Sequence, residues 1–306
     1  MKLAVFGAGG VGAYLGARLA DAGHEVHLIA RGEHLEALRA DGLRLESVAG
    51  DTTVRLPATD DPAEVGPCDA VLFCVKAYDT RSAAAELAPL LEAGTAVVSF
   101  QNGVDNERWL ADEVGEEHVC GGVAYVFSTI GAPGVVEHTG GPARVVYGEL
   151  DGEPTDRIRR LDGALQAAPG VEAVLADDIR VELWRKFVFI CAQAGVTAAT
   201  RLPVGEIRET ETTWRLYRRI MEEVAAVARA EGVDLPEGTV DEWAEFAREL
   251  DPGSYSSLHH DLEEGGRLEL DALHGSVVRH AEAAGVDVPM NEAVEAMLRP
   301  WADRRG

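Results

Sequence analysis

The first half of the 306-residue chain alternates short apolar runs with amphipathic segments, which predicts strands and helices in turn. The strands expected are Leu3–Phe6, Glu25–Ile29, Ala70–Val75, Ala96–Ser99, Gly122–Phe127, Gly134–His138, Arg144–Tyr147 and Val171–Val174, with a short β segment within Leu43–Leu56. The helices expected between them are Glu33–Asp41, Thr80–Leu91 and Pro154–Gln166. This alternation is typical of a doubly wound α/β sheet.

From about Asp177 the pattern changes to long helical segments separated by glycine and proline. These helices are expected at Asp177–Ala194, Thr212–Glu231, Asp241–Leu250, Asp271–Ala284 and Asn291–Trp301. We therefore predict an α/β fold in which an N-terminal Rossmann-type dinucleotide-binding domain at residues 1–176 precedes an all-helical C-terminal domain at residues 177–306. The helical domain would serve substrate binding or dimerisation.

A glycine-rich loop follows the first strand and opens the first helix. Its sequence, Gly7-Ala8-Gly9-Gly10-Val11-Gly12, fits the dinucleotide-binding pattern in the required strand–turn–helix context. Gly7 would allow the tight turn, Gly9 the close approach of a pyrophosphate, and Gly12 the packing of helix on strand. The helix N-terminus would attract the phosphates. We expect all six residues to bind a dinucleotide.

The end of the second strand indicates which dinucleotide. NAD-binding versions carry an acidic residue there, whereas this chain has Ala30-Arg31. A guanidinium group suits a 2′-phosphate, so the sequence favours NADPH over NADH. The alternative is that Arg31 is a solvated residue at the start of the next helix.

The composition narrows the range of partners. A net charge of −25 argues against nucleic acid and anionic membranes and suggests a high-salt interior. The longest uncharged stretch, Phe187–Thr200, is too short to span a bilayer. Because the first predicted strand begins almost at residue 1, we expect no signal peptide. The cysteines are scattered and the histidines form no metal-ligand set. We expect a cytoplasmic protein without a metal.

Lysine is rare here, since only Lys2, Lys76 and Lys186 stand among 28 basic residues. A lysine retained in such a chain suggests a need for an ammonium group that can lose its proton. Lys76 and Asn102 end successive strands, where a doubly wound sheet binds ligands, although Asn-Gly also favours a plain turn. Lys186 lies on an apolar helix, where burial would lower its pKa. It could instead extend to the surface beside Glu182.

These motifs, taken in order, resemble the ketopantoate reductase (2-dehydropantoate 2-reductase) family over essentially the whole chain. The matching elements are the Gly7–Gly12 loop, Val75-Lys76-Ala77, Gln101-Asn102-Gly103, Pro133–His138, Trp184-x-Lys186, Ser256-Ser257 with Asp261, and Glu269-Leu270-Asp271 with Leu273-His274-Gly275.

The resemblance implies NADPH-dependent reduction of a 2-oxo acid, 2-dehydropantoate, in pantothenate and coenzyme A synthesis. Lys186 would match the family's catalytic lysine, and Glu269 the glutamate that contacts both substrate and lysine. Ser257 would help to hold the substrate carboxylate, with Asn102 and Lys76 at the nicotinamide end. Taken alone, Glu269 would be a solvated charge and Ser257 a helix cap.

The chain departs from the family where the substrate would bind. Asparagines usual four and eight residues after the catalytic lysine are replaced by Ile190 and Ala194, and a third is Ser254. Gln193 and Thr197 share the face of Lys186 and could substitute for the lost amides.

Two other functions follow as alternatives. One is a paralogous reductase of a more apolar 2-oxo acid. The other is a non-catalytic NADP(H)-binding sensor, against which the retained Lys186 and Glu269 argue. The helical domain could also form a homodimer.

Overall fold

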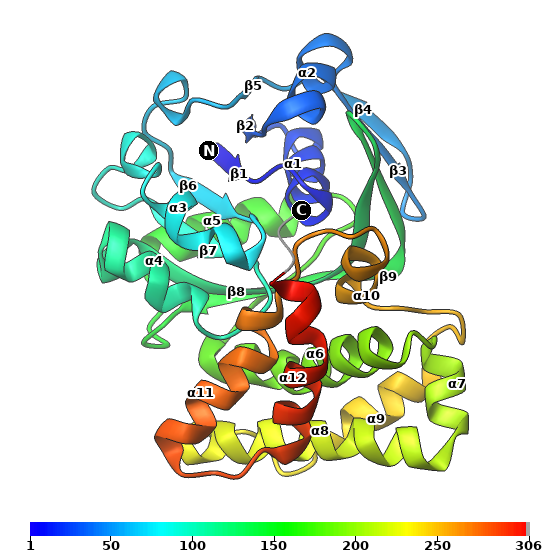
Figure 1. Ribbon diagram of the computed structural model, residues 1–306. Coiled ribbons are helices and arrows are strands. Elements are labelled where there is room, and N and C mark those ends of the chain that lie inside the picture. The colour runs from blue at the N-terminus through cyan, green and yellow to red at the C-terminus, as the bar shows by residue number, and fades with distance from the viewer. Residues whose placement is uncertain (304–306) are drawn as a thin grey trace. The chain divides into compact units, whose positions relative to one another are not determined.

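The computed structural model describes residues 1–303, which divide into two compact units (Figure 1). Unit 1 comprises Met1–Gln101 and Asn106–Ile179. Unit 2 comprises the short segment Asn102–Asp105 and the chain from Arg180 onward. The α/β fold with a C-terminal helical region is as the sequence predicts.

Unit 1 is built on one curved sheet whose centre is parallel. The strands are β1 (Lys2–Phe6), β2 (Glu25–Ile29), β3 (Leu43–Ser47), β4 (Thr52–Val54), β5 (Ala58–Thr59), β6 (Ala70–Phe73), β7 (Ala96–Ser99), β8 (Val119–Ala132), β9 (Val135–Glu149) and β10 (Glu172–Leu175). Their order is β4-β3-β9-β8-β7-β6-β1-β2-β5, with β10 beside β9. From β8 to β5 every pairing is parallel, and β8 pairs with β9 in antiparallel fashion.

This unit differs from the sequence prediction in several segments, among them the helix Asn106–Val114 and the short strand Ala58–Thr59, which were not predicted. The three short strands expected between Gly122 and Tyr147 are one long hairpin, in which irregular register near Phe127 bends the ladder without ending it. The expected helix at Thr80–Leu91 is only α3 (Thr80–Ala84) followed by a 3₁₀ turn around Pro89. Proline cannot donate the backbone hydrogen bond that would continue the helix.

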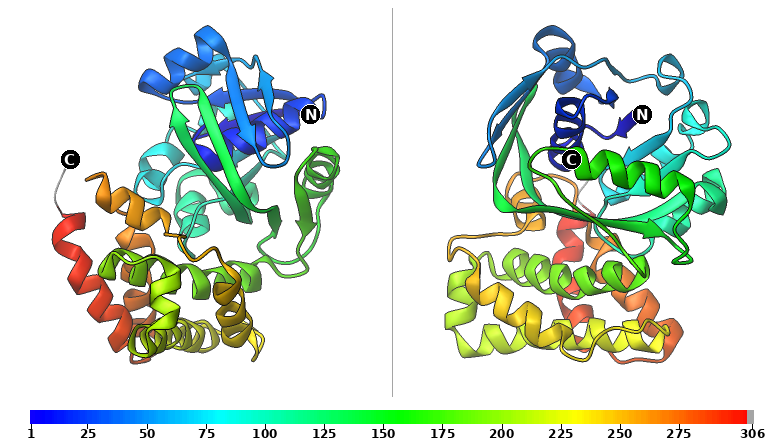
Figure 2. Two further views of the ribbon diagram at one scale, coloured as in Figure 1. Left: turned by 90° about the vertical axis from the view of Figure 1, so that its right-hand side faces the viewer. Right: turned by 180° about the vertical axis from the view of Figure 1, so that it is seen from behind.

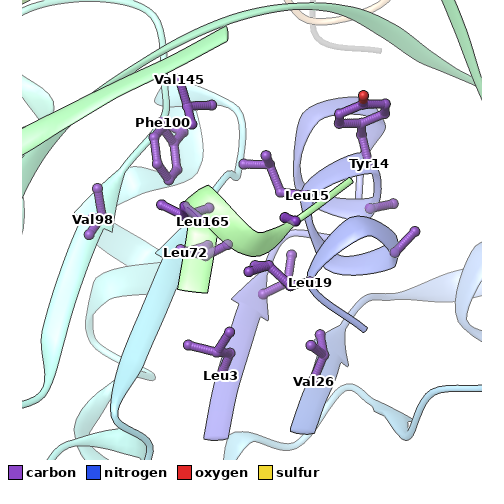
Figure 3. Close-up of a cluster of buried hydrophobic side chains, with 14 of the residues drawn as sticks. Leu3, Tyr14, Leu15, Leu19, Val26, Leu72, Val98, Phe100, Val145 and Leu165 are labelled. Carbon is purple, nitrogen blue, oxygen red and sulfur yellow. The ribbon is translucent and has the colours of Figure 1, made fainter. Parts of the chain in front are cut away.

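Helices cover both faces of the sheet. They are α1 (Gly10–Asp21), α2 (Gly32–Asp41), α3, α4 (Asn106–Val114) and α5 (Asp156–Ala167). Alternate residues of β1 divide between two cores: Leu3 and Val5 belong to the cluster under α1 and α5, and Ala4 and Phe6 to the opposite cluster. Figure 3 shows the first cluster, with Leu15 and Leu19 of α1 above the strands. Burial on both faces explains why these strands read as continuous apolar runs.

Unit 2 is entirely helical in its described part. Its helices are α6 (Ile179–Thr200), α7 (Val204–Glu209), α8 (Glu211–Ala230), α9 (Thr239–Glu249), α10 (Ser257–Glu263), α11 (His274–Ala284) and α12 (Pro289–Ala302). Figure 2 shows them from two further sides. Between Leu183 and Ala198 almost every side chain of α6 is buried, so α6 is the central helix of this core. A helix buried on all sides is apolar all round.

Candidate active site

The glycine-rich loop has the geometry of a phosphate-binding turn. Gly7 has φ of 98°, which favours glycine, and the N–H groups of Gly7 and Ala8 both donate to the Ile29 carbonyl at 3.1 Å. A Cβ on Gly12 would lie 2.2 Å from the Gly7 carbonyl oxygen, so the predicted close packing of helix on strand is confirmed.

The N-terminus of α1 is open to a ligand. Gly9 occupies the N-cap without a side chain to bond the first N–H groups, and no atom lies within 4 Å of a Cβ placed on it. The first N–H groups of a helix lack intrahelical partners and carry partial positive charge. The loop therefore fits a dinucleotide pyrophosphate, although Gly10 is needed for packing too, because a Cβ there would meet the Ser128 carbonyl oxygen at 2.2 Å.

Arg31 stands at the N-cap of α2, largely exposed, and is engaged by an acid. One guanidinium nitrogen donates to both carboxylate oxygens of Glu86, at 3.0 and 3.1 Å. An exposed ion pair of this kind is worth little, so a phosphate could displace Glu86 from Arg31.

The ends of β6 and β7 are joined by a buried network that the sequence did not reveal. The Gln101 side-chain amide donates to the Val75 carbonyl at 2.9 Å and to the Thr80 hydroxyl at 2.7 Å. The Thr80 hydroxyl in turn contacts the Asn106 amide oxygen at 3.1 Å. This network fixes the backbone beside Lys76, which caps a 3₁₀ turn, and before Asn102.

Lys186 and Glu269 are electrostatically coupled within unit 2. Lys186 is partly buried on α6, and burial lowers its pKa to about 8, against an opposing effect of the Glu269 carboxylate. Glu269 is only 7% exposed and precedes the 3₁₀ turn Leu270–Ala272 that leads into α11. The nearest acid along α6, Glu182, lies 3.8 Å from the Arg185 guanidinium instead. An ammonium with this pKa can donate a proton near neutrality.

The hydroxyl and amide side chains on the same face of α6 as Lys186 are buried and form hydrogen bonds. The Gln193 side-chain oxygen accepts from the Tyr217 hydroxyl at 3.0 Å. The Thr197 and Ser256 hydroxyls lie 2.7 Å apart, and Ser256 caps α10 by accepting from the His259 N–H. The buried serine is thus Ser256, whereas Ser257 is the exposed first residue of α10.

The two positions that lack the family's asparagines are apolar in their surroundings as well. Ala194 is 1% exposed and belongs to the core of unit 2. Ile190 is partly buried and packs against the same core. Neither residue offers a side-chain donor or acceptor to a substrate.

Within residues 1–303 no group of three or more His, Cys, Asp or Glu side chains could hold a metal ion. Among the same residues, no helix is both long and apolar enough to cross a membrane. The four cysteines are free thiols.

Known proteins resemble this chain over its full length. It is 31% identical to an uncharacterized oxidoreductase, YkpB, of Bacillus subtilis, covering 98% of this chain and 99% of that protein. It is 33% identical to a 2-dehydropantoate 2-reductase of Mesorhizobium japonicum, covering 100% and 99%. The crystal structure of a PanE/ApbA family ketopantoate reductase from Ralstonia eutropha superposes with a TM-score of 0.91 at 40% identity, covering 99% of each chain.

Two family descriptions match the two parts of the chain. "Ketopantoate reductase PanE/ApbA" matches residues 3–152, and its C-terminal counterpart matches residues 178–302. The fold, the glycine loop and these matches define an oxidoreductase that acts on a CH–OH group with a nicotinamide dinucleotide. The chain belongs to the PanE/ApbA ketopantoate reductase family. Its reaction is the NAD(P)H-dependent reduction of a 2-oxo acid.

Proposed function

We propose that the protein reduces 2-dehydropantoate to pantoate with NADPH, as a step of pantothenate and coenzyme A synthesis. The observation that carries the proposal is the coupled pair of Lys186, whose pKa burial lowers to about 8, and the buried Glu269. This pair supplies a proton donor of the right strength within a full-length relative of known 2-dehydropantoate 2-reductases.

A nicotinamide cofactor, when bound, would supply the hydride that the carbonyl carbon receives. Lys186 donates its proton to the carbonyl oxygen, which prevents a full negative charge from forming there. Glu269 keeps Lys186 protonated. Ser257, Asn102 and Gln193 are the residues that would bind the substrate. Lys76 and Asn102 would hold the nicotinamide end of the cofactor.

NADPH is proposed as the cofactor because no acid ends β2 and Arg31 stands there instead. The glycine loop, Gly7 to Gly12, would hold the pyrophosphate and Arg31 the 2′-phosphate. Arg31 remains exposed while it is paired with Glu86, so its guanidinium could exchange the Glu86 carboxylate for a 2′-phosphate.

A second function is favoured by Ile190 and Ala194. With both asparagines replaced by apolar groups, the enzyme could instead reduce a 2-oxo acid that lacks the hydroxyl group of 2-dehydropantoate. A site built to bind a hydroxyl rejects the analogue without it strongly, and an apolar site does not.

The test is NADPH consumption by wild type and Lys186→Ala, in molar potassium chloride, with two matched substrates. These are 2-dehydropantoate and trimethylpyruvate, which is the same 2-oxo acid without the hydroxyl group. Turnover of 2-dehydropantoate that falls roughly 10²–10⁴-fold in Lys186→Ala supports the proposal. Preference for trimethylpyruvate supports the second function. Absence of turnover with either, despite NADPH binding, would refute both.

A further inference from the structure

The carboxylate of Asp105 is buried in unit 2 and held by three side chains of α11. Asp105 is 3% exposed. It accepts hydrogen bonds from the Ser276 hydroxyl at 2.8 Å, the Arg279 guanidinium at 3.0 Å and the His280 Nε2 at 3.2 Å. Helical spacing places these donors on one face of α11. We call this arrangement the Asp105 clasp.

Burying the Asp105 carboxylate costs free energy, and its hydrogen-bond donors compensate for that cost. A buried carboxylate is tolerated only where donors and opposite charge surround it. The three donors hold the pKa of Asp105 well below its usual range, against the effect of burial. His280 also bonds Glu231 through Nδ1 at 2.9 Å, and the two carboxylates raise the pKa of its imidazole. Arg279 further donates to the Asp271 carbonyl at 2.9 Å.

The position of the clasp along the chain relates it to the candidate active site. Asp105 ends the short segment Asn102–Asp105, which clusters with unit 2 although it follows β7. Gly103 within it has φ of 111°, so the backbone turns sharply after Asn102. The helix that holds Asp105 starts at His274, shortly after Glu269. One helix thus anchors both the segment that carries Asn102 and the turn that carries Glu269.

We propose that Asp105 is a positioning residue, which uses α11 to fix the side chain of Asn102 for the cofactor and substrate. The inference rests on the proposed function in so far as Asn102 binds them. His280 contributes by donating to Asp105 and does not itself touch either ligand. A displacement of about 1 Å in a binding group can cost on the order of a hundredfold in rate, which makes such an anchor necessary.

The test compares His280→Leu, which cannot donate to Asp105, with His280→Gln, whose amide can. The NADPH dissociation constant is measured by fluorescence titration, and KM and kcat by NADPH consumption. We expect His280→Leu to weaken NADPH binding and to lower kcat/KM, each by about tenfold. His280→Gln should recover both to within about threefold of wild type.

Two further variants separate positioning from general stability. Val227→Ala removes buried methyl groups from α8 and should lower thermal stability without changing the NADPH dissociation constant. The double variant Asp105→Ala/His280→Leu should weaken NADPH binding by less than the two single substitutions would if their free-energy effects were added. The reason is that both substitutions act through one carboxylate.

The proposal is overturned if His280→Leu loses stability as Val227→Ala does but keeps wild-type NADPH binding and kcat/KM. It is also overturned if His280→Gln behaves like His280→Leu. The titration needs no substrate, so it tests the positioning role of Asp105 even if no 2-oxo acid is reduced in the turnover assay. That latter failure would count against the proposed function instead.

Discussion

Burial on α6 lowers the pKa of Lys186 to about 8, and the negative charge of the Glu269 carboxylate opposes this shift. In the proposed mechanism the reduction needs the protonated ammonium of Lys186, so kcat/KM should be constant below this pKa. Above it, kcat/KM should fall about tenfold for each pH unit. The proposed mechanism therefore assigns the alkaline limit of the reaction to Lys186.

Glu269→Gln should shift that alkaline limit. Removal of the negative charge leaves burial unopposed, so the pKa of Lys186 falls and the midpoint of the alkaline limb moves roughly one pH unit lower. The measurement is the pH profile of kcat/KM. Glu182→Gln is the matched control, since this acid lies on the same helix but close to Arg185, and its profile should not move. An unshifted limb in Glu269→Gln would contradict the coupling.

Cofactor preference should depend on Arg31 and Glu86. Arg31→Ala should raise the KM for NADPH about ten- to a hundredfold and leave the KM for NADH nearly unchanged, because only NADPH offers a 2′-phosphate. Glu86→Gln should lower the KM for NADPH by a few-fold, about the strength of an exposed ion pair. Both constants come from initial rates with each nucleotide.

A neighbouring arginine provides the control for this pair. Arg39 also forms an exposed pair, with Asp60 at 3.4 Å, and lies on the same helix as the end that Arg31 caps. Arg39→Ala should leave both KM values unchanged. If Arg31→Ala raised the KM values for NADPH and NADH equally, Arg31 would not bind the 2′-phosphate.

How much of this could be predicted from the sequence depends on how local each feature is. The glycine loop, the first strands and the change to helices are encoded by adjacent residues, and the structure has them as expected. The requirement for Gly10 is not local, because it arises from Ser128 on β8. The same holds for the Gln101–Thr80–Asn106 network, whose members look like ordinary turn and helix residues in the sequence.

The candidate site shows the same limit. The scarcity of lysine draws attention to Lys76 and Lys186 without any structure, and the partner of Lys186 could be named only through family resemblance. Periodicity places Gln193 and Thr197 on the face of Lys186, but it cannot reveal that Tyr217 and Ser256 engage their oxygens. Pairs this far apart in sequence follow from tertiary packing alone.

Substrate preference is better tested by substitution of Ile190 than of Ala194. Ile190 is only partly buried, so Ile190→Asn should fold and should raise kcat/KM for 2-dehydropantoate relative to trimethylpyruvate, by about tenfold. Ala194 is fully enclosed, and Ala194→Asn should lose about 1–3 kcal/mol of stability through a buried, poorly bonded amide. Relative kcat/KM and thermal denaturation are the measurements. An unchanged ratio in Ile190→Asn would mean that this position does not contact the substrate.

Two glycines of unit 1 should give opposite results on replacement by alanine. A Cβ on Gly12 would lie 2.2 Å from the Gly7 carbonyl oxygen and 2.9 Å from Val5, and both neighbours belong to the nucleotide-binding turn or the strand beneath it. Gly12→Ala must therefore push α1 from the sheet, which should cost about 1–3 kcal/mol of stability and weaken NADPH binding at least tenfold.

Gly163, inside α5, has no atom within 4 Å of a Cβ placed there. Gly163→Ala should stabilise the protein by about 0.5–1 kcal/mol, because alanine is the better helix former, and leave NADPH binding unchanged. Thermal denaturation with fluorescence titration of NADPH checks both variants. Equal behaviour of the two would contradict the close packing of α1 on β1.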